Sequence, residues 1–214
     1  LAAALRQHGH DAAILDCQQP GRKQQLPLPA AFAYMSRFLA AGDKSPFRLY
    51  GRYCHFGITW DEIREHIAEL RPQAVGISCQ FTPYVAETLK TAEIVKSISP
   101  AIPVIAGGSH ASALPGQVLE SPHVDYAVIG EGEQALPGLV GCLAAGHDCS
   151  TVPGIAWKRG GQVISNARGG FIDDLDSLPL PARDLLEPSW YAIGKTPCAM
   201  LLTSRGCPQR CSYL

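Results

Sequence analysis

The sequence has no apolar run of the roughly 18–20 residues that are needed to cross a bilayer, and it has no long basic run. Its 18 Lys and Arg residues nearly balance 19 Asp and Glu residues, so the formal net charge is −1. This balance provides no electrostatic footprint for a nucleic acid or an anionic membrane. We therefore expect no nucleic-acid partner and no membrane span.

Several signatures of nucleotide binding and catalysis are also missing. Neither G-x-G-x-x-G nor G-x-x-x-x-G-K-[ST] occurs, so the usual dinucleotide and P-loop interpretations have no support. No Ser/His/Asp or Cys/His set has a defensible geometry, and we assign no catalytic residue. The chain starts without Met or a charged-then-apolar leader, so we expect its natural N-terminus to lie further upstream.

The chain contains eight cysteines, an even count that could indicate disulfides. Six of them are scattered through an α/β pattern without the spacing of a disulfide scaffold. Such cysteines in a cytosolic protein are mostly buried thiols. A reducing, cytoplasmic location fits the pattern better, with a disulfide framework as the alternative.

Helix and strand patterns alternate along most of the chain. Thr59 and Glu62 form a capping box that opens a helix, and Thr82-Pro83 is a start signal for another. Short apolar runs between the helices predict buried strands. We expect helices over 1–9, 59–70, 82–97 and 114–120, with a last one ending near 145, and strands over 12–15, 74–78, 102–106 and 126–129.

This alternation predicts an α/β fold with a parallel, flavodoxin-like (Rossmann-like) sheet and flanking helices. We expect a further, central strand before residue 1. The first domain then covers 1–148, with an insertion at about 18–57 that includes a helical piece over 30–41. A β-hairpin (154–158 and 162–164) and a linker occupy 149–197. Residues 198–214 begin a second domain, with its first strand at 199–203.

The predicted strands 74–78, 102–106 and 126–129 are each followed by a polar or Gly-rich segment. Ligands of open parallel sheets bind at the carboxyl ends of the strands, and glycines there let a ligand approach the backbone. The alternative is that these glycines only close tight turns, and that the Glu131/Glu133 pair only stabilises a helix N-terminus. The candidate binding residues are Ser78, Gln80, Thr82, Gly107, Gly108, Ser109, His110, Gly130, Glu131 and Gly132.

Two further cysteines, Cys207 and Cys211, stand in C-x-x-x-C spacing at the C-terminal end. Thiolates converging on a short loop are typical ligands of iron–sulfur clusters, so we predict a metal-binding role for both. A third ligand would fall at position 214, where the sequence has Leu. Either the sequence is cut just before that ligand or the ligand is lost; two unrelated buried thiols are the remaining alternative.

The stretch Thr203-Ser-Arg-Gly-Cys-Pro-Gln-Arg-Cys-Ser-Tyr213 resembles the start of a radical S-adenosylmethionine (SAM) domain. In that family the three cysteines of C-x-x-x-C-x-x-C bind a [4Fe–4S] cluster whose free iron holds SAM. The resemblance implies that Cys207 and Cys211 are the first two of these ligands, and that a TIM-barrel-like domain follows. Leu214 departs from the pattern and leaves the third ligand unidentified.

The preceding segments resemble the cobalamin (B12)-binding domain that stands in front of many radical SAM domains. The similarity is carried by Pro72–Ser78, Val104–His110, Val124–Glu133, Gly154–Trp157 and Asp174–Pro179, in this order. It implies that the corrin lies across the strand ends, with the nucleotide tail beside the glycines. The D-x-H-x-x-G motif of some B12 proteins is not found; it would lie before residue 1. His110 is the stronger histidine candidate for ligand contact and His55 the weaker.

The resemblance implies the cobalamin-binding part of a radical SAM enzyme that transfers a methyl group to carbon or performs an oxidative cyclisation on a small molecule. Its cofactors would be cobalamin, a [4Fe–4S] cluster and SAM, and we expect these 214 residues alone to be catalytically inert. One alternative is a domain that does not bind B12, as in methylthiotransferase-like enzymes. The other is a non-enzymatic corrinoid methyl carrier, which would not need the cysteine loop.

Overall fold

The computed structural model describes residues 1–38, 53–194 and 196–206. Its main sheet has five strands in chain order: β3 (Val75–Ser78), β4 (Val104–Gly107), β5 (Tyr126–Val128), β6 (Ile155–Arg159) and β7 (Gln162–Ser165). β3, β4 and β5 are parallel, whereas β6 is antiparallel to β5 and β7 to β6. The expected flavodoxin-like α/β fold is confirmed, and the expected hairpin extends this sheet as β6 and β7.

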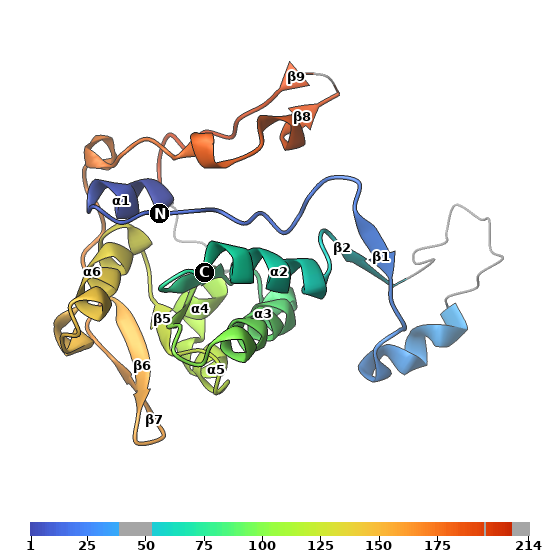
Figure 1. Ribbon diagram of the computed structural model, residues 1–214, viewed down its shortest axis with the longest axis horizontal. Coiled ribbons are helices and arrows are strands. Elements are labelled where there is room, and N and C mark those ends of the chain that lie inside the picture. The colour runs from blue at the N-terminus through green and yellow to red at the C-terminus, as the bar shows by residue number, and fades with distance from the viewer. Residues whose placement is uncertain (39–52, 195, 207–214) are drawn as a thin grey trace.

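Helices cover both faces of the sheet (Figure 1). In the central strand β4, Val104 and Ala106 pack into a core that includes residues of α2 (Trp60–Leu70), α3 (Val85–Ile98) and α5 (Pro115–Leu119). The intervening Ile105 packs into a second core with Leu139 of α6 (Gly132–Ala144) and Ile155. Successive side chains of a strand point to opposite faces, which explains why a run that is apolar at every position forms this strand.

The capping box of α2 is present as the sequence predicts. The Glu62 backbone N–H donates to Thr59 Oγ1 at 3.3 Å, and the Thr59 N–H donates to a Glu62 carboxylate oxygen at 2.8 Å. The bond from the Thr59 N–H, a second bond from Thr59 Oγ1 to the same carboxylate oxygen at 2.9 Å and the contact with Arg22 lower the pKa of Glu62 to about 2. The helix ends at Arg71, which adopts the left-handed conformation with φ +46°.

Two strand predictions need correction. Residues 12–15 form no strand, because a strand requires a hydrogen-bonded neighbour and none of the described strands pairs with this segment; the central strand expected upstream of residue 1 remains a prediction. β3 is not buried on both faces, since its residues alternate between half-buried and exposed. It pairs with β4 alone among the described strands and therefore forms an edge of the described sheet.

Several local boundaries also differ. Thr82–Tyr84 form a single 3₁₀ turn (η2) before α3, and no side chain caps that helix. α4 (Ser109–Ala113) was not predicted and comes before the expected helix at α5. In the insertion, the described part of the expected helix is a 3₁₀ helix, η1 (Ala30–Phe38), and β1 (Lys23–Gln25) pairs antiparallel with β2 (Cys54–Phe56). Residues 199–203 form no strand and lack regular structure.

The segment after the hairpin runs back beside the N-terminal part of the chain (Figure 1). Asp184 pairs with Arg6 of α1 (Ala2–Gln7) at 2.6 Å, and the Tyr191 hydroxyl donates to Asp16. This bond to Asp16 raises the pKa of Tyr191 to about 12. Along this segment lie η4 (Leu175–Ser177), η5 (Arg183–Leu185), η6 (Pro188–Trp190), β8 (Ala192–Ile193) and β9 (Thr196–Pro197), whereas η3 (Cys149–Thr151) precedes the hairpin.

Within the described ranges, no helix is long and apolar enough to cross a membrane. The six cysteines that the structure describes are free thiols.

Candidate functional site

The loops that follow β3 and β4 form one continuous surface at the carboxyl end of the sheet. Ser78 and Gly107 are register partners, and Cys79 N–H donates to Gly107 O at 2.6 Å just beyond them. The Gln80 amide donates to Ser109 Oγ at 2.9 Å. Ser78, Gln80 and Ser109 are exposed. The structure therefore brings together the first two groups of predicted binding residues.

Gly108 has a structural role that is independent of any ligand. Its φ is +113°, and a Cβ there would lie 2.8 Å from the carbonyl oxygen of Cys79. The next residue but one, His110, donates its backbone N–H to the same oxygen at 3.1 Å. For Gly108, a tight backbone contact accounts for the glycine.

Gly130 differs from Gly108 in its surroundings. Its φ is +83°, yet a Cβ would meet no atom within 4 Å. Its N–H donates to Ser112 Oγ at 2.9 Å, which ties the loop after β5 to α4. The open space beside Gly130 is room that a ligand could occupy. Sequence reasoning missed Ser112, because a serine in a short helix carries no pattern that marks such a bond.

His110 lies beneath the surface rather than on it. Its side chain is 3% exposed, and its Nδ1 lies 3.0 Å from Thr82 Oγ1. Its Nε2 is buried and has no hydrogen-bond partner in the part of the chain that the structure describes. His110 thus connects the loop after β3 to α4, and its ring does not reach the exposed edge. The Thr82 hydroxyl, expected to cap a helix, is engaged in this contact instead.

His55, the weaker histidine candidate, lies away from the strand ends, beside α2. Its Nε2 is 3.1 Å from Ile58 O and its ring packs against Trp60 with centroids 5.0 Å apart. These contacts account for its position without a ligand.

Glu131 and Glu133 make contacts that their sequence positions did not suggest. Arg205 donates to Glu131 Oε1 at 3.0 Å from Nη1 and to Glu133 Oε1 at 2.5 Å from Nη2. Glu131 Oε2 also accepts the Ile172 N–H at 2.6 Å. The Ile172 bond, followed by the Arg205 bond, lowers the pKa of Glu131. Glu133 does stand in the first turn of α6, but Glu131 makes no side-chain capping bond to that helix.

The remaining members of the predicted set are placed as follows. A Cβ on Gly107 would meet only Val128 Cβ at 3.9 Å, whereas one on Gly132 would lie 2.9 Å from the side chain of Leu1. Cys207 and Cys211 lie outside the described residues. Within the described residues, no three His, Cys, Asp or Glu side chains are grouped to hold a metal ion.

An aromatic pair that was not predicted as part of the site borders this surface. Phe81 and Tyr84 meet edge to face with ring centroids 6.2 Å apart, and they are 61% and 54% exposed. They follow β3 directly and stand beside Gln80. The edge therefore combines apolar rings with neutral hydrogen-bonding groups.

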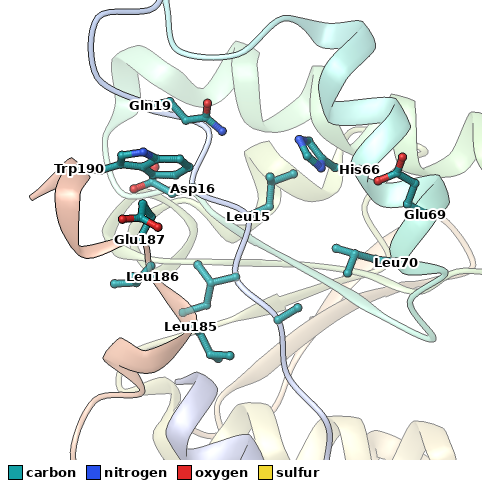
Figure 2. A pocket seen from close by; sticks show the side chains of 12 residues that line it. Leu15, Asp16, Gln19, His66, Glu69, Leu70, Leu185, Leu186, Glu187 and Trp190 are labelled. Carbon is teal, nitrogen blue, oxygen red and sulfur yellow. The ribbon is translucent and has the colours of Figure 1, made fainter.

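Two open cavities lie elsewhere. One, of about 410 Å³, lies between residues 13–19, the C-terminal half of α2 and residues 185–190 (Figure 2). The other, of about 490 Å³, contains Pro100 and Asp125, which precede β4 and β5 and so mark the amino ends of the strands. Neither is lined by a predicted binding residue. We place the candidate site at the carboxyl ends, where ligands of open α/β sheets bind.

Residues 1–140 match the family of B12 binding domains, which is more than half of the 214 residues. The chain belongs to the B12-binding domain family. The match ends within α6 and includes β3, β4, β5 and the loops at their carboxyl ends.

Curated relatives of this B12-binding domain are longer proteins. It is 32% identical over 194 residues to the anaerobic magnesium-protoporphyrin IX monomethyl ester cyclase of Rubrivivax gelatinosus, covering 86% of this chain and 34% of that protein. It is 30% identical over 158 residues to the cobalamin-dependent radical SAM methyltransferase TokK of Streptomyces tokunonensis, covering 71% and 23%. The chain spans about a third of the length of the first relatives it matches.

Among solved structures, the chain resembles the cobalamin-dependent S-adenosylmethionine radical enzyme OxsB. The TM-score is 0.51 at 22% identity, and the overlap covers 59% of this chain and 18% of OxsB. This similarity confirms the fold.

Proposed function

We propose that this chain is the cobalamin-binding region of a B12-dependent radical SAM enzyme. The observation that carries the proposal is a contact between the two segments with family resemblance. Glu131 and Glu133, which follow β5 in the B12-binding domain, pair with Arg205, which stands two residues before Cys207. One chain thereby connects the candidate corrinoid site to the first cysteine of a radical SAM-like motif.

The residues at the edge suit cobalamin chemically. Gln80 and Ser109 are exposed neutral groups that can hydrogen-bond the amide side chains of the corrin or the phosphate of its tail. Phe81 and Tyr84 offer apolar surface to a large ring, and the backbone at Gly130 is open to close approach. The carboxylates of Glu131 and Glu133 are both paired with Arg205. Their negative charge is therefore compensated and would not repel the phosphate of the cobalamin tail.

His110 has a supporting role in this proposal. Its contact with Thr82 fixes the loop that carries Gln80 and Phe81, and its buried ring is not placed to ligate cobalt at the exposed edge. When bound, the cobalamin would supply the methyl group or radical chemistry, while these side chains orient it and limit water access.

In the intact protein, Cys207 and Cys211 would bind a [4Fe–4S] cluster together with a third cysteine, and SAM would bind that cluster. Methyl transfer and oxidative cyclisation are both consistent with the names of the relatives. The substrate would be a small molecule bound mainly by the following domain, and the location would be cytoplasmic. We expect the 214 residues alone to form no 5′-deoxyadenosine from SAM.

The site is tested by filling the open space at Gly130. A Gly130→Leu variant of the full-length protein should bind hydroxocobalamin at least about tenfold more weakly, because the side chain would occupy the space beside the edge. Gly160→Leu is the matched control: Gly160 also has positive φ (+60°) and open space around it, but it lies in the β6–β7 turn. Equal affinities of both variants, measured by equilibrium absorbance titration, would place cobalamin elsewhere.

A further inference from the structure

We propose that Arg205, Glu131 and Glu133 form a clamp that holds the segment leading to the predicted cluster ligands against the carboxyl ends of the strands. This inference rests on the proposed function, because it assigns a role to the segment that leads into the predicted cluster ligands. The three residues are positioning residues: they act through the loop and not on substrate.

The geometry of the clamp is specific. Arg205 uses two different guanidinium nitrogens on two different carboxylates, at 3.0 and 2.5 Å. A planar guanidinium presents its donors in a fixed fork, whereas the ammonium of lysine is a compact point charge. Lysine at position 205 could therefore pair with one carboxylate but would not hold the same orientation.

The environment of the clamp separates it from an ordinary surface ion pair. Side-chain exposure is 18% for Glu131, 17% for Glu133 and 34% for Arg205, compared with 45% and 49% for the Lys90–Glu93 pair on α3. Exposed pairs contribute little because water screens them and the side chains lose entropy. In the clamp, the entropy lost by ordering the Arg205 side chain is incurred once for two ion pairs.

The clamp is also bonded to the backbone of the linker. Glu131 accepts the backbone N–H of Ile172, so the same carboxylate holds the linker as well as Arg205. Both glutamates follow Gly130 at the end of β5, on the edge that carries Gln80 and Ser109. Residues 199–205 have no regular secondary structure. Side-chain contacts such as the clamp, rather than a sheet or a helix, therefore hold this segment to the domain.

The consequence is that the clamp sets the separation between the two cofactors. Arg205 stands two residues before Cys207, and its partners Glu131 and Glu133 stand at the carboxyl ends of the strands, where we place cobalamin. Loss of the clamp should leave each cofactor bound but release residues 199–206 from the strand ends, and so lengthen the mean distance between the cluster and cobalt.

The experiment uses the full-length protein reconstituted anaerobically with cluster and cobalamin. Glu133→Gln is the main variant, because Glu133 has Arg205 as its partner, whereas Glu131 also holds Ile172. Glu93→Gln is the control, since it removes one carboxylate from a surface ion pair. The readout is electron paramagnetic resonance: a reduced cluster near cob(II)alamin speeds its spin relaxation and raises the microwave power that saturates its signal.

We expect Glu133→Gln to retain cobalt and iron but to lose this relaxation enhancement. The microwave power that saturates the cob(II)alamin signal should fall towards the value measured with the cluster oxidised. Glu93→Gln should match the wild type. In an Arg205→Met background, Glu133→Gln should have no further effect, because the partner is already gone. Hydrogen–deuterium exchange of residues 198–206 should be faster in both clamp variants, with or without cofactors.

Unchanged relaxation and unchanged exchange in Glu133→Gln would overturn the clamp, as would equal effects of Glu133→Gln in the wild-type and Arg205→Met backgrounds. A wild-type protein that holds no iron or no cobalt overturns the proposed function and this inference with it. The two failures are therefore distinguishable from the metal content of the wild type.

Discussion

Replacing Gly108 with alanine should destabilise the chain by about 2–4 kcal/mol. The backbone there has φ +113° and ψ −177°, a conformation that is essentially restricted to glycine and costs other residues of order 1–3 kcal/mol. The new Cβ would also lie 2.8 and 2.9 Å from the carbonyl atoms of Cys79. If the loops separate to relieve that contact, the bonds Cys79 N–H to Gly107 O and His110 N–H to Cys79 O weaken, at about 1 kcal/mol each.

The assay is urea unfolding followed by tryptophan fluorescence, with Gly141→Ala as the control. Gly141 lies within α6, its φ is not positive, and a Cβ there would meet nothing within 4 Å. That substitution should be neutral or stabilising by up to about 1 kcal/mol, because glycine is unfavourable inside a helix. A Gly108→Ala destabilisation below about 1 kcal/mol would refute the argument that backbone contact with Cys79 requires glycine.

Three further predictions concern stability. Glu62→Gln should lower thermal stability above pH 4.5 and have progressively less effect as pH falls towards 2, because bonds from the Thr59 backbone N–H and hydroxyl depress the folded-state pKa of Glu62 to about 2; a penalty that is the same at all pH values would contradict it. Tyr191→Phe should weaken thermal stability below pH 10 and have progressively less effect as pH rises towards 12, because the bond to Asp16 raises the folded-state pKa of Tyr191 to about 12; a pH-independent effect would rule this out. His110→Phe should change the free energy of unfolding by less than about 1 kcal/mol, because the loss of the bond to Thr82 is offset by removal of the buried Nε2, which has no described partner; a loss of several kcal/mol in urea would contradict this balance.

Features that depend on neighbouring residues in the sequence could be predicted. The capping box at Thr59 and Glu62 is formed by residues three apart, and the structure shows both of its bonds. The apolar runs that became β4 and β5 are buried from both sides, so their composition alone marks them. Of the two glycines that follow the predicted strand 102–106, Gly108 fits the alternative in which a glycine only closes a tight turn, since its backbone closely approaches that of Cys79.

Features that depend on a distant partner could not be predicted. Residues 12–15 have the composition of a strand, but a strand exists only where another one pairs with it. Arg205 is separated in the sequence by 74 residues from Glu131 and by 72 from Glu133, so no local sequence pattern predicts these contacts. The hydrogen bond between His110 and Thr82 similarly joins α4 to the segment after β3, 28 residues apart, and the His110 side chain is buried although ligand contact at the edge was expected.

The most direct test of the central claim is the metal content of the full-length protein. The protein would be reconstituted anaerobically with iron, sulfide and hydroxocobalamin, passed through gel filtration, and analysed for cobalt and iron. The proposed function predicts that cobalt and iron are retained together. Iron without cobalt would contradict the cobalamin assignment and favour a domain that has lost B12, whereas cobalt without iron would leave a corrinoid carrier.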